Sequence, residues 1–377
     1  MTDLRDQFII WYHNLFQQSE LYQRMTETVE DSPWHRERNV GVHTDMVVSQ
    51  YLSITPDTWT SATLHGAFAC AFHDVGKPDS EEIKFREDRG EYRAYNGHEK
   101  VSARLWEDYA VTHFKHLQSS FGLDKKDIFA VGFLIEHHLP WGLKKPEKRF
   151  ALAKTLLTFL GDEIHIFFAV LISDTWGRIS DNQEDKRRKA LLWIKEFSET
   201  PPIEEKERNK DKILYLPIGA SGCGKSTYYH NNIPNETVHY SWDDIRLELY
   251  LSDEERENIC DNYNLAFNRQ VEDSDFYQKA QRIFIDHIKE GKDIYVDNTN
   301  LTRKRRAFFI QEARRHGYKI IALMFPLSLK TLYDRQENRQ DKIIACEVSK
   351  RHYMSLQLPQ IGEVDEIWIE DIANDGS

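Results

Sequence analysis

The chain has 377 residues, of which 40% are hydrophobic and 12% aromatic, and its formal net charge is -12 at pH 7. This length suits two domains better than one. The negative charge argues against a protein that coats nucleic acid through bulk charge, but allows an enzyme that grips a few phosphates in local basic pockets.

Four widely spaced cysteines without a Cys-x-x-Cys pair argue against a disulfide framework or a thiolate zinc site, and favour a reducing compartment. The N-terminus lacks the apolar run of a secretory signal, and no segment approaches the ~20 apolar residues that span a bilayer. The sequence therefore predicts a cytoplasmic protein with no membrane partner.

Apolar residues recur at helical spacing up to about residue 195, and β-branched runs are scarce there. We therefore expect an all-α first domain over residues 1–199. Residues 200–212 contain two prolines and many charges, which is typical of a linker. Short apolar runs at 213–218, 237–241, 293–296 and 319–325 then alternate with charged helical segments, so residues 213–377 are expected to form an α/β domain with a parallel sheet.

The first domain holds histidines and aspartates that suit a divalent metal site without thiolate, for example Mn²⁺, Co²⁺, Ni²⁺ or Zn²⁺. An upstream histidine, a His-Asp doublet and a late aspartate supply four ligands for one ion. Further histidines supply the ligands of a second ion, and the aspartate of the doublet bridges the two. Two such ions ~3.5–4 Å apart can clamp a phosphoryl group and activate a water. The candidate ligands are His43, His73, Asp74, His98, His137, His138 and Asp174.

Each of these residues also has an ordinary interpretation. His43 could be a half-exposed helix residue, and His98 could simply begin a helix. Adjacent helix positions point about 100° apart, so His137 and His138 divide into one ligand and one group that supports it or contacts substrate. The residues that carry a family resemblance are His43, His73-Asp74 with Gly76-Lys77, His98, His137-His138 and Asp174 followed by Trp-Gly-Arg178.

Residues 30–195 resemble the HD-domain metallophosphohydrolase superfamily in these motifs. The resemblance implies an all-helical fold, divalent metal and hydrolysis of phosphomonoesters or phosphodiesters, with Asp74 at the catalytic centre. It also makes Lys77 and Arg178 candidate substrate contacts, although either could be an ordinary surface cation.

The second domain carries a complete P-loop pattern, Gly219-x4-Gly224-Lys225-Ser226, between a predicted strand and a predicted helix. Glycines let backbone N–H groups approach the phosphates, the lysine reaches the β- and γ-phosphates, and the serine ligates Mg²⁺. The expected nucleotide-binding residues are Gly219, Gly222, Gly224, Lys225, Ser226 and Thr227.

Downstream residues suggest a phosphate acceptor. Asp243 follows the second predicted strand and can take the proton of an attacking hydroxyl, and Arg246 one turn later can grip an acceptor phosphate. Asp297 ends a third strand near the Mg²⁺ position. Arg335 and Arg339 share one helix face and could close over the triphosphate, although a helix cap at Asp243 and a solvated helix at 335–339 are the plain alternatives.

The P-loop, Asp243-Asp-x-Arg246, Asp297-Asn-Thr-Asn-Leu301 with its Arg/Lys run, and Arg335/Arg339 look like the 5′-polynucleotide kinase family. By that resemblance Asp243 is the general base on a 5′-hydroxyl, Arg246 holds the neighbouring acceptor phosphate, and Arg335 and Arg339 steady the phosphates of ATP or another NTP. The phage enzyme of that family has a 3′-phosphatase domain after its kinase, and no Asp-x-Asp nucleophile motif follows the kinase motifs here.

The two halves together resemble bifunctional HD-Pnk end-healing enzymes. The resemblance implies hydrolysis of 2′,3′-cyclic phosphate and removal of 2′- or 3′-phosphate in the HD domain, and 5′-OH phosphorylation of RNA or DNA ends in the kinase. The absence of a Lys-x-Asp-Gly motif predicts a separate ligase, and the sequence leaves open whether the chain is a monomer or a homo-oligomer. Two alternatives stay open: a nucleotide-pool enzyme that joins an HD nucleotidase to a nucleoside or small-metabolite kinase, and a nucleotide-switched regulator.

Overall fold

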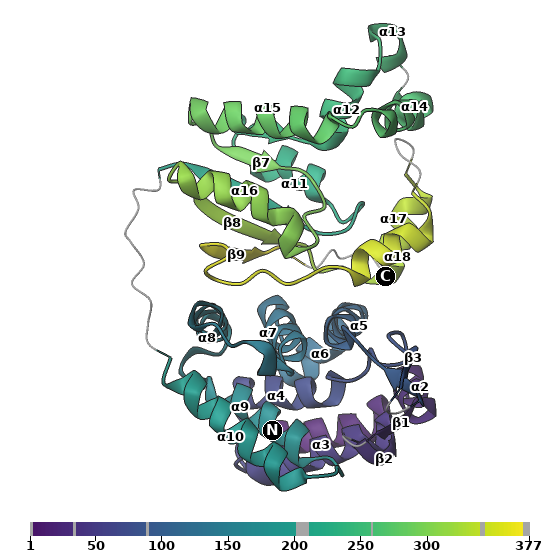
Figure 1. The fold of residues 1–377 in the computed structure, drawn as a ribbon, viewed down its shortest axis with the longest axis vertical. Helices are drawn as coiled ribbons and strands as arrows, with labels where there is room; N and C mark the ends of the chain where they lie inside the picture. The colour runs from purple at the N-terminus through teal and green to yellow at the C-terminus, as the bar shows by residue number, and fades with distance from the viewer. Residues whose placement is uncertain are drawn as a thin grey trace. The chain divides into compact units, whose positions relative to one another are not determined.

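The computed structural model describes residues 3–32, 35–87, 90–200, 211–257, 259–339 and 344–371 (Figure 1). The chain divides into two compact units, Met1–Glu204 and Glu205–Ser377. The predicted linker 200–212 spans this division, and its residues 201–210 lie outside the described part of the chain.

The N-terminal unit is built mainly of helices. They are α1 (Leu4–Trp11), the π-helical turn η1 (Tyr12–Phe16), α2 (Glu20–Glu27), α3 (Val40–Ile54), α4 (Ser61–Phe72), α5 (His98–Thr112), α6 (Phe114–Phe121), α7 (Lys125–Glu136), α8 (Pro146–Leu160), α9 (His165–Trp176) and α10 (Gln183–Ser198), with 3₁₀ turns η2 (Pro140–Gly142) and η3 (Gly161–Glu163).

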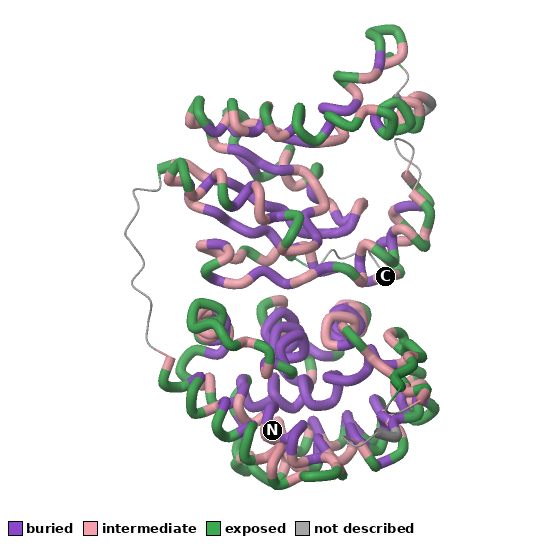
Figure 2. Tube along the Cα trace, viewed as in Figure 1, coloured by how far each residue is buried: buried purple, intermediate pink, exposed green. Residues whose placement is uncertain are grey.

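Helix α4 lies at the centre of this unit, and every residue from Ala62 to Phe72 is buried (Figure 2). A helix that is apolar all round is a core helix. Its aromatic side chains meet others from α1 and α5, as in the edge-to-face pair of Phe68 with Trp11 at 4.8 Å and of Phe72 with Trp106 at 5.0 Å between ring centroids. This packing fixes the end of α4, from which His73 and Asp74 follow.

The expectation of an all-α first domain needs a correction, because the unit contains two antiparallel hairpins. One pairs β1 (Val29–Ser32) with β2 (His35–Asn39), and the other pairs β3 (Glu82–Arg86) with β4 (Gly90–Ala94). Their strands are rich in charged residues, and the apolar pair Ile83 and Phe85 is 71% exposed. A strand without a buried apolar face gives no alternating hydrophobic signal, so the sequence pattern missed both hairpins.

The C-terminal unit contains a five-stranded sheet in the order β6-β7-β5-β8-β9, in which every pairing is parallel. Its strands are β5 (Ile213–Ile218), β6 (Val238–Tyr240), β7 (Ile294–Val296), β8 (Lys319–Met324) and β9 (Glu366–Ile369). Four of them coincide with the apolar runs in the sequence. The edge strand β9 was not predicted, because its half-exposed residues, which include Trp368, form only a short run.

Helices cover both faces of this sheet. They are α11 (Lys225–Asn232), α12 (Trp242–Tyr250), α13 (Asp253–Arg256), α14 (Ile259–Glu272), α15 (Phe276–Glu290), α16 (Arg303–Arg315), α17 (Leu329–Glu337) and α18 (Cys346–Met354). Tyr229 of α11 packs on Tyr295 of the sheet at 5.2 Å, whereas Phe284 of α15 and Phe309 of α16 pack together at 4.9 Å and contact Tyr240.

Pro217 lies in the central strand β5, where a proline is unusual because it cannot donate to a ladder. The pairing of β5 with β7 covers Leu214 and Tyr215 only. Beyond it, the carbonyl of Pro217 accepts a hydrogen bond from Nδ2 of Asn300 at 2.9 Å. Since the N–H and C=O of one strand residue point to the same side, the missing N–H of Pro217 faces a position where the ladder has ended.

In the described residues no single helix is long and apolar enough to cross a membrane. The pair Pro146–Glu163 and His165–Trp176 passes by length and composition together, with a bend of 101° between its parts.

Candidate active sites

The His73-Asp74 doublet follows α4 in a turn that packs closely on the start of α5. A Cβ on Gly76 would lie 2.6 Å from the backbone nitrogen of Ser102 and 2.7 Å from the carbonyl oxygen of His98. The N–H of Gly76 also donates to Oγ of Ser102 at 2.9 Å. Only glycine allows this approach, and the approach brings Asp74 beside His98.

Six of the seven predicted ligands converge in two buried groups. Nε2 of His43 lies 3.2 Å from Oδ1 of Asp174 and 3.3 Å from Nε2 of His73, which forms the first group. In the second group, Oδ1 of Asp74 lies 3.0 Å from Nε2 of His98 and 3.7 Å from Nε2 of His138.

Asp74 links the two groups through its two oxygens. Its Oδ2 lies 3.1 Å from Nε2 of His73 and 3.5 Å from Nε2 of His43, while Oδ1 faces His98 and His138. Asp74 therefore lies between the two groups, and its bridging of two ions stays a prediction. The converging side chains come from α3, α5 and α9 and from the turns after α4 and α7.

The opposite ring nitrogens are held by backbone carbonyls. Nδ1–H of His73 donates to Cys70 at 2.8 Å, that of His98 to Tyr95 at 2.7 Å, and that of His138 to Ile135 at 2.7 Å. A carbonyl can only accept, so each neutral ring presents an unprotonated Nε2 to the centre. This arrangement is the usual preparation of a histidine for metal binding.

The donor set fits divalent cations on this geometry. Nε2 of His98 and Nε2 of His138 are both acceptors, yet they face each other at 3.4 Å. Oδ2 of Asp174 is buried and has no hydrogen-bond partner within the described residues. Facing lone pairs and an orphaned carboxylate oxygen are costly in a buried site unless a cation lies between them.

The electrostatics of the centre favour ionised carboxylates. Burial alone would raise the pKa values of Asp74 and Asp174, but their neighbours, chiefly His73 and Lys77 for Asp74 and Arg178 for Asp174, hold both well below the usual range. Burial and the neighbouring His73 and His98 lower the pKa of His138 to about 3. Neutral imidazoles and charged carboxylates are the forms that bind metal.

Lys77 and Arg178 have acidic partners inside the unit. Nζ of Lys77 is buried between Oδ2 of Asp74 at 2.7 Å and Oε1 of Glu30 at 2.6 Å. The guanidinium of Arg178 contacts the side chain of Asp174 and donates to its carbonyl at 2.7 Å. Each cation thus balances a carboxylate of the centre, and the predicted contacts with substrate stay a prediction.

His137 is the exception among the predicted ligands, because it lies outside the two groups. It is absent from both groups of described residues; its Nδ1–H donates to the carbonyl of Phe133 at 2.9 Å and its ring lies 4.2 Å from the Phe133 ring. Because it directly follows α7, its side chain turns back along that helix while His138 points into the centre. Of the adjacent pair, His138 is the one that lies in a group of described residues able to hold an ion.

Sequence reasoning missed three residues beside the centre: Glu30, His35 and Glu37, which lie on the first hairpin. Oε1 of Glu37 lies 2.9 Å from Nδ1 of His43 and 3.0 Å from Nδ1 of His35. Oε2 of Glu37 also accepts from the N–H of Ile179 at 3.2 Å. Nothing local in this charged stretch distinguishes a buried glutamate from a solvated one, so only the fold identifies it.

The P-loop of the second unit connects β5 to α11 at the carboxyl end of the central strand. Gly222 and Gly224 have φ values of 90° and 110°, which favour glycine. Nζ of Lys225 donates to the carbonyls of Gly219 at 3.1 Å and Ala220 at 2.8 Å, while Ser226 and Thr227 are exposed. The loop therefore has the form that cradles phosphate.

Asp297 directly follows β7 and lies beside the P-loop. The side chain of Ser226 contacts it, and Nε2 of His239 lies 3.0 Å from its Oδ2. Burial would raise the pKa of Asp297, but His239, Lys225 and Ser226 lower it. A serine hydroxyl and an ionised carboxylate are the ligands that Mg²⁺ prefers beside a triphosphate.

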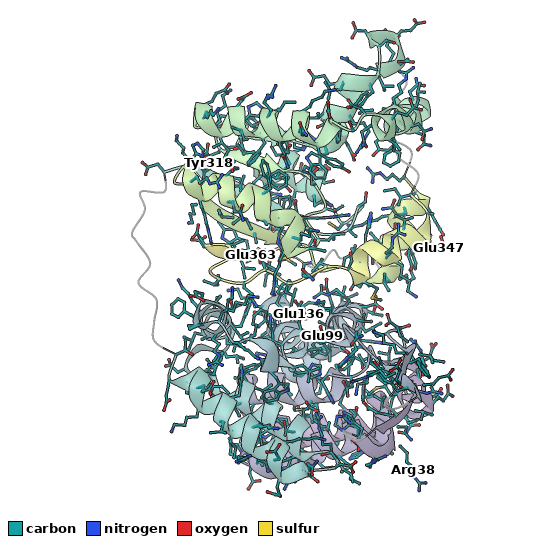
Figure 3. All side chains as sticks on the ribbon, viewed as in Figure 1. Arg38, Glu99, Glu136, Tyr318, Glu347 and Glu363 are labelled. Carbon is teal, nitrogen blue, oxygen red and sulfur yellow. The ribbon has the colours of Figure 1, made fainter. Side chains whose placement is uncertain are left out.

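The loop that carries Asp297 is fixed by a buried arginine. Arg306 forms a bidentate pair with Glu363 (labelled in Figure 3) at 2.8 and 3.1 Å and donates to the carbonyls of Asn300 and Leu301. Of the Arg/Lys run 303–306, this residue therefore stabilises the loop, whereas Arg305 is exposed and lines the cleft.

Asp243 and Arg246 lie side by side one turn apart on α12. A guanidinium nitrogen of Arg246 contacts Oδ1 of Asp243, which also accepts from the Tyr263 hydroxyl at 2.8 Å. The guanidinium is buried against three aromatic rings, with Phe267 5.3 Å from its carbon. Ser241 caps the helix, so the cap that Asp243 could have supplied is provided by its neighbour.

Arg335 and Arg339 both reach the P-loop from α17 and the residues after it. A terminal nitrogen of Arg335 donates to the carbonyl of Cys223 at 3.3 Å, and one of Arg339 donates to Oγ of Ser221 at 3.2 Å. Between them, Gln336 donates to the carbonyl of Ser221 at 2.6 Å. The pair thus lies beside the expected position of the triphosphate.

One cleft of ≈ 1470 Å³ is lined by the P-loop and by Asp243, Arg246, Asp297, Arg335 and Arg339. In Figure 1 its helices α12 and α14 lie near the β7 side of the sheet, and α17 and α18 lie nearer β8 and β9. Sequence reasoning missed several lining residues, whose types carry no motif: His230, His239, Trp242, Tyr263, Phe267, Tyr277, Phe309, Arg351 and His352.

Residues 214–357 match a sequence family described as an AAA domain. A protein of Autographa californica nuclear polyhedrosis virus, named "Putative bifunctional polynucleotide kinase/RNA ligase", is 29% identical over 144 residues. The C-terminal unit is a P-loop kinase-like domain. The match covers 38% of this chain and 20% of the viral protein, and a domain of this kind uses a nucleoside triphosphate with Mg²⁺.

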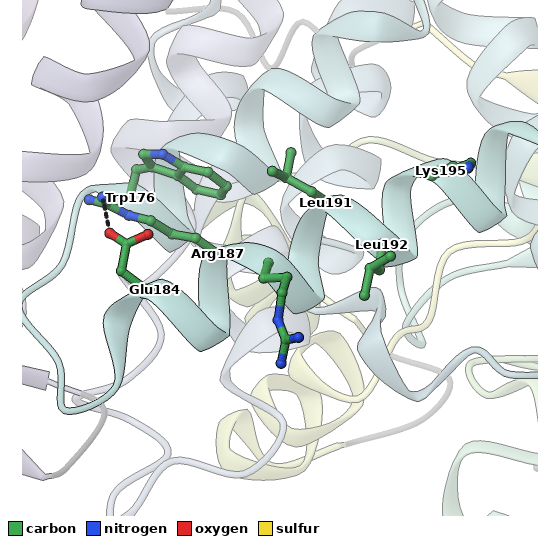
Figure 4. A pocket seen from close by; sticks show the side chains of 7 residues that line it. Trp176, Glu184, Arg187, Leu191, Leu192 and Lys195 are labelled. Atoms are coloured by element: carbon green, nitrogen blue, oxygen red, sulfur yellow. Dashed lines mark hydrogen bonds and ion pairs between the residues drawn. The ribbon is translucent and has the colours of Figure 1, made fainter.

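A separate hollow of ≈ 430 Å³ lies along α10 of the N-terminal unit (Figure 4). Arg187 lies 5.4 Å from the ring of Trp176 and 3.2 Å from Glu184, next to the half-exposed Leu191 and Leu192. Its lining contains none of the metal-ligand candidates, so it does not belong to either site.

Proposed function

We propose that the chain is a bifunctional end-healing enzyme for RNA or DNA. Its P-loop unit phosphorylates a 5′-hydroxyl with ATP or another NTP, and its N-terminal unit is an HD-type phosphoesterase that hydrolyses 2′,3′-cyclic phosphate and removes 2′- or 3′-phosphate. The observation that carries the proposal is the convergence of two His/Asp groups on Asp74 in one unit of a chain whose other unit is kinase-like.

In the N-terminal unit, His43, His73 and Asp174 would hold one divalent cation, and His98 and His138 would hold a second, with Asp74 shared between them. Such cations supply Lewis-acid polarisation of the phosphoryl oxygens and a water of lowered pKa. The protein itself orders this centre. Backbone carbonyls fix the rings of His73, His98 and His138. Lys77 and Arg178 balance the excess negative charge of the carboxylates.

In the C-terminal unit, Asp243 would accept the proton of the attacking 5′-hydroxyl, and Arg246 would hold the phosphate on the 3′ side of that nucleoside. Arg246 is preorganised for this by its aromatic surround and by Gln270, whose side-chain oxygen lies 3.3 Å from Nε. Lys225, Arg335 and Arg339 would balance the charge of the transferring phosphoryl group.

The test uses the full chain with ATP, Mg²⁺, Mn²⁺ and a short RNA that has a 5′-hydroxyl and a 2′,3′-cyclic phosphate. We expect mass spectrometry of the product to show a 5′-monophosphate and a free 2′,3′-diol. A cyclic end that stays intact with Mn²⁺, Ni²⁺ and Co²⁺ each supplied would contradict the phosphoesterase assignment. Equal phosphorylation of mononucleosides and oligonucleotides would favour a nucleotide-pool enzyme.

A further inference from the structure

The acceptor side of the kinase cleft carries aromatic surface that the proposed chemistry does not use. Trp242, at the first turn of α12, lies directly before Asp243 and lines the cleft with Tyr277 of α15. Their ring centroids are 5.3 Å apart in an edge-to-face pair, and Tyr277 is 52% exposed. Large aromatic side chains kept open to solvent in a cleft are unusual and suit ligand recognition.

The indole of Trp242 is held in place on its other sides. Its Nε1–H donates to the hydroxyl of Tyr240 at 3.1 Å, its ring lies 6.2 Å from that of the buried Phe309, and its backbone N–H donates to Oδ1 of Asn298 at 3.1 Å. Because its one polar hydrogen is satisfied within the protein, the indole offers a ligand only its π surface. A fixed π surface recognises a planar ring by stacking.

Asn298 adds a polar contact at the same place. Since Oδ1 accepts from the Trp242 N–H, the orientation of the amide is set and Nδ2 is the donor. That Nδ2 is buried and has no partner among the residues that the structure describes, although Asn298 lines the cleft. An unsatisfied buried donor is costly, and an acceptor atom of a bound nucleoside would satisfy it.

We propose that Trp242 and Tyr277 form a stacking platform for the nucleobase of the acceptor's 5′-terminal nucleoside. The inference rests on the proposed kinase function, in which Asp243 contacts the 5′-oxygen of that nucleoside. The base next to that oxygen then lies on the residue before Asp243. Stacking uses the face of the base and every base has such a face, so the site recognises the terminal nucleoside without preference for its sequence.

The donor nucleotide does not compete for this platform. Its phosphates belong to the P-loop, Arg335 and Arg339, and the cleft continues from there toward α18, where Arg351 and His352 line it. Trp242 of α12 instead packs with Tyr277 of α15 and Phe309 of α16, next to the proposed base Asp243. Changes to the platform should therefore alter the KM for the oligonucleotide and leave the KM for ATP unchanged.

The test combines protein variants with abasic acceptors. Wild type, Trp242→Leu and Trp242→Phe are assayed with a 5′-OH oligonucleotide, the same oligonucleotide abasic at its 5′-terminal position, and one abasic at the second position. We expect the terminal abasic site to raise the KM of the wild type about 10-fold, the size of one lost stack. With the intact acceptor, the KM of Trp242→Leu should be raised by the same factor, and the terminal abasic site should raise it no further. Trp242→Phe should retain most of the affinity for the intact acceptor.

Controls separate the possible outcomes. Trp368→Leu, at a 40% exposed tryptophan on β9 outside the cleft lining, should leave both KM values unchanged. If Trp242→Leu does not fold, as judged by its circular dichroism spectrum, Tyr277→Ala at an exposed position carries the same measurement. Three results would overturn the inference. The terminal abasic site could raise the KM of Trp242→Leu as much as that of the wild type, only the abasic site at the second position could raise the KM, or a folded Trp242→Leu could show a raised KM for ATP. Failure of the wild type to phosphorylate any oligonucleotide would instead overturn the proposed function together with it.

Discussion

His73 and Asp74 are neighbours in the sequence, and both side chains point into one buried centre, where Nε2 of His73 lies 3.1 Å from Oδ2 of Asp74. Successive residues of a helix diverge by about 100°. The doublet lies at the end of α4, where His73 is the C-cap with φ -55° and ψ -35°. The metal binding proposed for this centre therefore depends on how the chain leaves α4 as well as on the ligands.

Asp74→Asn should abolish phosphate removal and leave the kinase unchanged. Asp74 contacts both ligand groups, so both proposed cations would need its charge. Loss of several kcal/mol of transition-state stabilisation corresponds to a rate at least about 100-fold lower. Release of phosphate from a 3′-phosphorylated oligonucleotide measures the rate of phosphate removal. Asp79→Asn, whose carboxylate pairs with Arg24, is the matched control; an active Asp74→Asn enzyme would exclude this residue from the chemistry.

Glu37→Gln should weaken metal binding without touching a ligand. Glu37 is a positioning residue, since its carboxylate holds Nδ1 of His43 at 2.9 Å. Loss of such a partner typically lowers metal affinity about 10- to 100-fold. Titration of the full chain with Mn²⁺ measures the affinity, and Glu82→Gln, at an exposed glutamate paired with Lys84, serves for comparison. Unchanged Mn²⁺ affinity would give Glu37 a purely structural role.

Asp243→Asn should lower the kcat of the kinase by about 10²- to 10⁴-fold, the usual contribution of a general base. The KM for ATP and the phosphoesterase activity should not change, because Asp243 lies on the acceptor side of the cleft. Steady-state transfer from labelled ATP gives both constants. Asp253→Asn, at a fully exposed position of α13, should behave as wild type. A variant that loses both activities would contradict two independent sites.

Arg246→Lys should reduce the preference for acceptors that carry a phosphate on the 3′ side of the terminal nucleoside. Lysine keeps the charge but lacks the planar fork, and hydrogen bonds to a charged group are worth about 1.5–3 kcal/mol. We expect a loss of roughly 10- to 100-fold in kcat/KM for a 3′-phosphorylated nucleoside, with little change for the unphosphorylated nucleoside. Equal losses with both acceptors would assign Arg246 to structure and favour a nucleoside kinase.

The stability of the nucleotide-free kinase unit should fall between about pH 6.5 and 9. Burial alone would lower the pKa of His239, but the carboxylates of Asp244 and Asp297 raise it to about 9. A group whose pKa is raised on folding stabilises the fold fully below its unfolded pKa and loses that contribution as the pH rises through the folded value. Hydrogen exchange of the β6 and β7 amides in the full chain, corrected for intrinsic rates, measures the stability of this unit. His239→Asn should remove this pH dependence, and an identical profile in that variant would contradict the assignment.

The sequence predicted those features of the fold and of the sites that depend on local residue patterns. The P-loop and four of the five strands follow from apolar runs and glycine spacing, and six of seven metal-ligand candidates converge. It could not predict the charged hairpins or the burial of Glu37, because neither leaves a periodic hydrophobic signal. The different surroundings of His137 and His138 and the ring pair of Trp242 with Tyr277 depend on where helices end and pack, which a short-range pattern does not determine.

The central claim is that the two His/Asp groups around Asp74 bind metal. The most direct measurement is anomalous diffraction from crystals of the full chain grown with Mn²⁺, recorded at the manganese absorption edge. The account predicts anomalous peaks between Nε2 of His43 and His73 and between Nε2 of His98 and His138. Crystals that contain Mn²⁺ only elsewhere, or none at saturating concentration, would contradict it.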